Sequence, residues 1–64
     1  MKVNGKTLPL PAPITLAAFL LQQGYDGNRL AVERNGEIVP RAQFEATVLQ
    51  EGDVLEIVSF VGGG

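Results

Sequence analysis

The last residues of the sequence, Val61-Gly62-Gly63-Gly64, are those whose types and order could do chemistry. Three glycines form an arm of roughly 10 Å, and no Cβ obstructs its entry into a narrow active site. The α-carboxyl group of Gly64 is ionised at neutral pH, so it is a poor electrophile but can attack the α-phosphorus of ATP. An acyl-adenylate formed in this way has a reactive carbonyl carbon. We therefore predict a modification site at Gly64, with Gly62 and Gly63 as its arm.

Two other interpretations of the glycines compete with this one. Glycines are common in frayed chain ends and in cloning remnants, and this alternative stays open. A phosphate-binding loop would need Lys-Ser/Thr and a helix after the glycines, and no residue follows Gly64 in this sequence. We reject the phosphate-loop interpretation.

Histidine and cysteine are absent from the sequence. A histidine-based triad, a thiol nucleophile and a His/Cys metal site are therefore excluded. Acidic pairs remain at Glu33 with Glu37 and at Glu51 with Asp53, but both pairs lie at expected turns. We interpret them as solvated turn charges. The sequence thus predicts a protein that is not an enzyme and holds neither a metal nor a cofactor of its own.

The composition limits the architecture and the partners. With 64 residues we expect one domain over 1–61 followed by a flexible glycine tail at 62–64. The net charge is −2 and the basic residues are scattered, which argues against nucleic acid as a partner. No apolar run approaches the roughly 20 residues that span a bilayer, and the N-terminus lacks the pattern of a signal peptide. We expect a cytoplasmic protein without a membrane partner.

Two Asn-Gly pairs, Asn4-Gly5 and Asn35-Gly36, predict tight hairpins, because both central positions of such turns need positive φ. In the first hairpin, Val3 is expected opposite Lys6. The strands predicted on either side of the two turns are 1–3, 6–8, 30–34 and 37–39.

A helix is predicted between Thr15, a suitable N-cap, and Gly24, a suitable C-terminal cap. Leu16, Phe19 and Leu20 recur at the spacing of one buried helix face. Further along, we expect a short helical turn over 41–46 and a turn at 51–53.

The last predicted strand, 54–61, is the most apolar stretch. Alternation places Leu55 and Ile57 on one face, toward the core, and Val58 and Phe60 on the other. Exposed apolar side chains next to the tail are either ordinary surface or a docking patch for a partner. We favour docking through Val58, Phe60 and Val61.

The order of elements predicts an α+β fold. We expect a mixed sheet of four to five strands packed on one main helix, with the last strand parallel to the first. This arrangement is the β-grasp, or ubiquitin-like, fold.

The sequence resembles the ThiS/MoaD family of ubiquitin-like sulfur carriers along nearly its whole length. Phe44 stands where relatives often have Trp, a difference that leaves the carrier chemistry unchanged. The segments that support the resemblance are Asn4-Gly5, 30–36, 38–41 with Phe44, 51–53 and 56–64.

This resemblance implies a sulfur carrier for thiamine biosynthesis. An adenylating enzyme of the ubiquitin-activating type would use ATP and Mg²⁺ to convert the Gly64 carboxylate to an acyl-adenylate. Sulfur from a donor such as cysteine desulfurase would then replace AMP and form a thiocarboxylate. Thiazole synthase is the implied acceptor. Alternatives are the small subunit of molybdopterin synthase, a carrier for tRNA thiolation, and a non-catalytic β-grasp binding module.

Overall fold

Two asparagine–glycine turns shape both edges of the main sheet. The structure is a computed structural model that describes residues 1–25 and 29–60. Asn4 and Gly5 have φ angles of 51° and 84°, and Asn35 and Gly36 have 53° and 85°, as turns with two left-handed central residues require. The predicted pairing of Val3 with Lys6 is confirmed. These turns connect β1 (Lys2–Val3) to β2 (Lys6–Thr7) and β4 (Leu30–Arg34) to β5 (Glu37–Ile38).

The helix α1 (Leu16–Gln22) begins and ends where the sequence predicts. The Thr15 hydroxyl accepts a hydrogen bond from the backbone N–H of Ala18 at 3.1 Å, which satisfies a donor of the first turn. Gly24 has a φ of 81°. Its N–H and that of Tyr25 donate to carbonyls of the last helical turn at 3.1 and 2.9 Å. These two hydrogen bonds form a Schellman motif, which explains why the helix ends there.

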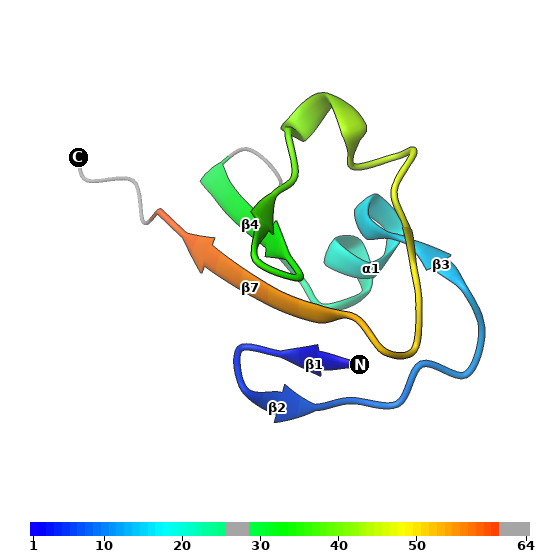
Figure 1. Cartoon of the computed structure of the whole chain (residues 1–64). Helices are drawn as coiled ribbons and strands as arrows, with labels where there is room; N and C mark the ends of the chain where they lie inside the picture. The colour runs from blue at the N-terminus through cyan, green and yellow to red at the C-terminus, as the bar shows by residue number, and fades with distance from the viewer. Residues whose placement is uncertain (26–28, 61–64) are drawn as a thin grey trace.

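The last strand, β7 (Val54–Ser59), lies at the centre of a five-stranded mixed sheet of order β2-β1-β7-β4-β5 (Figure 1). It runs parallel to β1 and antiparallel to β4. The predicted α+β β-grasp fold is confirmed, with α1 against one face of the sheet. The strand ends at Ser59, earlier than the predicted residue 61, and Val61 lies outside the described residues.

A second, two-stranded sheet was not predicted. β3 (Ile14–Thr15) pairs antiparallel with β6 (Val48–Leu49), and this pairing ties the start of α1 to the segment before β7. The predicted helical turn over 41–46 is present as a short 3₁₀ helix, η2 (Arg41–Gln43).

The core lies between the inner face of the sheet and α1. Leu16 of the helix, Leu49 of β6 and Leu55 of β7 are completely buried. Full burial of such a side chain contributes about 1.5–3 kcal/mol relative to leaving it exposed. The predicted core positions on α1 and on β7 are confirmed, and Phe44 is buried as well. The buried hydrophobic residues are Met1, Val3, Leu16, Phe19, Leu20, Val32, Phe44, Leu49, Leu55 and Ile57.

Within the described part of the chain, no helix has both the length and the apolar character needed to cross a membrane.

Candidate functional site

Two of the three predicted docking residues, Val58 and Phe60, lie on the side of the sheet that points away from the helix. Val58 and Phe60 are 53% and 55% exposed, whereas Leu55 and Ile57 on the opposite face are 0% and 6% exposed. The alternation of a strand thus separates core from surface as predicted. The remaining predicted site residues, Val61 and Gly62 to Gly64, lie outside the described residues.

The register of the sheet defines what surrounds these residues on the outer sheet face, the side of the sheet opposite α1. Ala31 is opposite Val58, Glu33 is opposite Glu56, and Ile38 is opposite Glu33. Two exposed glutamates therefore occupy directly opposite positions on neighbouring strands, with apolar residues at the positions around them. The sequence prediction missed this pair because the two glutamates are distant in the chain and meet only through the register. The outer sheet face carries Lys2, Thr7, Ala31, Glu33, Ile38, Val54, Glu56 and Val58, and Phe60 follows directly after β7 at the end of this face.

Strand β1 ends at Val3, and past this point the side chain of Asn4 forms the hydrogen bonds to the edge of β7. The Asn4 amide donates to the carbonyl of Ile57 at 3.2 Å, and its Oδ1 accepts from the N–H of Ile57 at 2.8 Å. On the other edge, the N–H of Phe60 donates to the carbonyl of Arg29 at 2.8 Å. The chain is therefore hydrogen-bonded to Asn4 on one side at Ile57 and to Arg29 on the other side at Phe60, next to the predicted docking residue Val58.

Asp53 corrects one of the sequence interpretations. It was predicted to be a solvated turn charge, but it is only 5% exposed. Its carboxylate accepts hydrogen bonds from Arg34 Nε at 2.9 Å, Asn35 Nδ2 at 3.0 Å and the Gln50 N–H at 2.8 Å. The interpretation failed because two of these donors come from a distant hairpin that only the fold brings near.

These donors also determine the ionisation of Asp53. Burial disfavours the charged carboxylate, but the hydrogen bonds from the Gln50 N–H, Asn35 and Arg34 and the charge of Arg34 outweigh it, so the pKa of Asp53 lies below its ordinary value. Asn35 also accepts from the N–H of Val54 through Oδ1 at 2.9 Å. The charged network therefore fixes the beginning of β7 to the β4–β5 turn.

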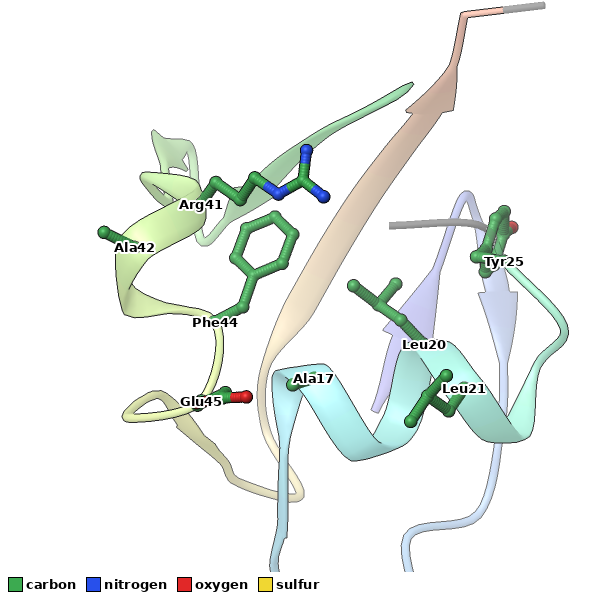
Figure 2. A pocket seen from close by; sticks show the side chains of 8 residues that line it. All are labelled: Ala17, Leu20, Leu21, Tyr25, Arg41, Ala42, Phe44 and Glu45. Carbon is green, nitrogen blue, oxygen red and sulfur yellow. The ribbon is translucent and has the colours of Figure 1, made fainter. Parts of the chain in front are cut away.

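A groove of about 360 Å³ lies on the helix side of the molecule (Figure 2). Ala17, Leu20 and Leu21 of α1 form one wall, and Arg41 and Phe44 form the other. It holds one acidic and one basic side chain and no thiol or imidazole, so we assign no catalytic chemistry to it. Over residues 1–25 and 29–60, no group of three or more acidic, histidine or cysteine side chains could hold a metal ion.

Comparisons with known proteins agree with this fold. The model of the ThiS family matches residues 1–64. The chain is 34% identical to the sulfur carrier protein ThiS of Bacillus subtilis, covering 100% of this chain and 98% of that protein. It is 44% identical to a thiazole synthase of Paramagnetospirillum magneticum over 97% of this chain. The chain spans about a fifth of the length of this synthase and of a second one, from Magnetococcus marinus (19% of each).

A solved structure extends the agreement to three dimensions. The crystal structure of the thiamine biosynthesis protein ThiS from Geobacter metallireducens superimposes with a TM-score of 0.80 at 32% identity, covering 98% of this chain and 96% of that one. Sequence and structure agree over nearly the full length, and the chain therefore belongs to the ThiS family of sulfur carriers.

Proposed function

We propose that this chain carries sulfur for the formation of the thiazole ring of thiamine, with the carboxyl group of Gly64 as the point of attachment. The observation that supports this most is a ThiS-family β-grasp domain whose central strand is followed in the sequence, after Phe60 and Val61, by three glycines. Similarity to two thiazole synthases and to a sulfur carrier protein agrees with it.

The chemistry begins at the terminal carboxylate. One carboxylate oxygen attacks the α-phosphorus of ATP in an adenylating partner enzyme, and pyrophosphate leaves. The carboxylate is thereby converted to an acyl-adenylate, whose carbonyl carbon is electrophilic. Mg²⁺ in the partner offsets the charge of the phosphates. The terminal sulfur of a persulfide, supplied by a donor such as a cysteine desulfurase, attacks this carbon, and AMP leaves. A thiol reductant then attacks the donor's sulfur of the acyl disulfide, forms a disulfide with the donor and releases the thiocarboxylate. The resulting thiocarboxylate delivers its sulfur to thiazole synthase.

In this proposal the folded domain positions the tail and catalyses no step itself. Glycines without Cβ atoms fit a narrow active site, and Val58 and Phe60 dock the carrier beside it. Hydrogen bonds to the backbone of Ile57 on one side and of Phe60 on the other fix the segment that carries these two side chains. A well-ordered platform lowers the entropic cost of binding, because less has to be immobilised on contact.

The test is intact-mass measurement of the purified chain after incubation with MgATP, the adenylating enzyme of the same organism and a sulfur donor. We expect a gain that corresponds to one oxygen replaced by sulfur. A variant lacking Gly63 and Gly64 is the matched control and should gain nothing. An unchanged mass of the complete chain, with an adenylating enzyme shown to be active, would contradict the proposal.

A further inference from the structure

Two glutamates occupy the middle of the outer sheet face and face each other across neighbouring strands. Glu33 of β4 and Glu56 of β7 are directly opposite in the register. Directly opposite like charges destabilise an antiparallel pair. Both side chains are exposed, and the ion pair found in the described part of the chain joins Arg34 to Asp53 instead. Over the residues that the structure describes, no side chain forms an ion pair that would offset this repulsion.

Apolar side chains border this pair on three sides. Val54 precedes Glu56 by two residues on the same face of β7, and Val58 follows it by two. Ile38 lies opposite Glu33 on β5. Val54, Ile38 and Val58 are 45%, 72% and 53% exposed. A partner that covers the apolar side chains must also remove water from the two carboxylates between them.

Removing water from two unpaired carboxylates costs more than burial of the surrounding apolar groups returns, unless a positive charge meets them. We infer that the surface docking on this face presents an arginine or lysine, set among apolar side chains, to the Glu33–Glu56 pair. Arginine fits best, because its planar guanidinium can donate to two carboxylates at once. The inference rests on the proposed function and specifies the chemistry of the partner's contact surface.

The same charges argue against two other occupants. A second copy of this chain, docked by two-fold symmetry over the pair, would bring four carboxylates together. Lys2 lies on the same face, but its register partner on β7 is Val54, two residues before Glu56. Arg29 precedes β4, and its carbonyl is bonded to Phe60, beyond the end of β7. A divalent metal ion would have only two carboxylates from this chain as ligands.

The test measures binding of the full chain to the purified adenylating enzyme at several salt concentrations. Glu33→Gln with Glu56→Gln removes both charges and keeps the side-chain shapes. Glu45→Gln with Glu51→Gln is the matched control, since it makes the same change in net charge at exposed residues outside the outer sheet face. We expect the first double variant to raise Kd at least about tenfold and to flatten the dependence of Kd on salt. The control should stay close to the unmodified chain.

Thermal unfolding of the free chain separates lost contact from lost fold. Because the first double variant relieves a repulsion, its Tm should equal or exceed that of the unmodified chain. Equal Kd values and salt dependence for the two double variants would overturn the inference while leaving the proposed function intact. Binding that requires Mg²⁺ and disappears with EDTA, or self-association through this face, would overturn it too. Absence of binding by the unmodified chain would instead contradict the proposed function.

Discussion

The two faces of β7 have similar apolar content but different roles. On the inner face, Leu55 and Ile57 pack into the core with α1. On the outer face, Val54, Val58 and Phe60 are about half exposed. Burial on the inner face stabilises the fold. The exposed apolar groups of the outer face do not contribute in this way, and covering them would favour binding of a partner. One strand thus supports the domain with one face, and the proposed docking uses the other.

The largest difference between the faces should appear on removing a side chain from each. Leu55→Ala is expected to cost about 2–5 kcal/mol, because it deletes a completely buried side chain and leaves a cavity. Domains of this size rarely have more than about 3–5 kcal/mol of total stability, so the variant should be largely unfolded. Val58→Ala should change the free energy of unfolding by no more than about 0.5 kcal/mol. Urea unfolding followed by circular dichroism measures both, and similar losses for the two would remove the distinction.

The second prediction concerns the anchor at the beginning of β7. Asp53→Asn should cost about 1–3 kcal/mol, because Arg34 and the Gln50 N–H lose a charged acceptor. Since the folded-state pKa of Asp53 is lowered, its stabilisation is present above the ordinary value of 3.8 and is lost as the pH falls through the folded-state pKa. The variant should therefore lose stability less steeply on acidification.

Unfolding free energies of both chains between neutral and acid pH check this prediction. An identical decline with falling pH in the two chains would show that Asp53 does not contribute as the hydrogen bonds indicate.

The third prediction concerns the edge of β7. Asn4→Gly keeps the positive φ of the turn but removes both hydrogen bonds to Ile57. We expect a cost of about 0.5–1.5 kcal/mol for the lost bonds and faster amide exchange at Ile57. Hydrogen exchange followed by NMR measures it, with Gly5 left unchanged so that the turn type is preserved. Unaltered exchange at Ile57 would mean that the side chain does not hold this edge.

The smallest stability effect is predicted for the outer sheet face. Phe60→Ala should change unfolding by no more than about 0.5 kcal/mol yet weaken binding to the adenylating enzyme, since large aromatic side chains dominate contact surfaces. Calorimetric titration compares it with Leu21→Ala, an exposed apolar residue on the helix (77% exposed). Equal affinities of the two variants would argue against docking through β7.

Local turn chemistry made much of this fold predictable. Asn4-Gly5, Asn35-Gly36 and the caps Thr15 and Gly24 act on their immediate neighbours, so the residue types alone indicate the turns and the helix. Alternation along β7 likewise separates Leu55 from Val58 without knowledge of the fold.

The features that sequence reasoning missed all depend on contacts between distant segments. Pairing of β3 with β6 joins two-residue strands that have no local signal. Burial of Asp53 requires Arg34, nineteen residues away along the chain. Likewise, Glu33 faces Glu56 only because the register of β4 and β7 places them there.

The most direct test of the carrier role compares two chains that differ only at the end. One ends on Gly64 and the other carries one additional alanine, and both are incubated with MgATP, the adenylating enzyme and a sulfur donor before intact-mass measurement. The chain that ends on Gly64 should gain the mass difference between sulfur and oxygen. The extended chain should not, because its terminal carboxylate belongs to alanine and lies one residue further along. Equal gain by both chains, or gain by neither, would contradict the assignment of the Gly64 carboxyl group as the reactive centre.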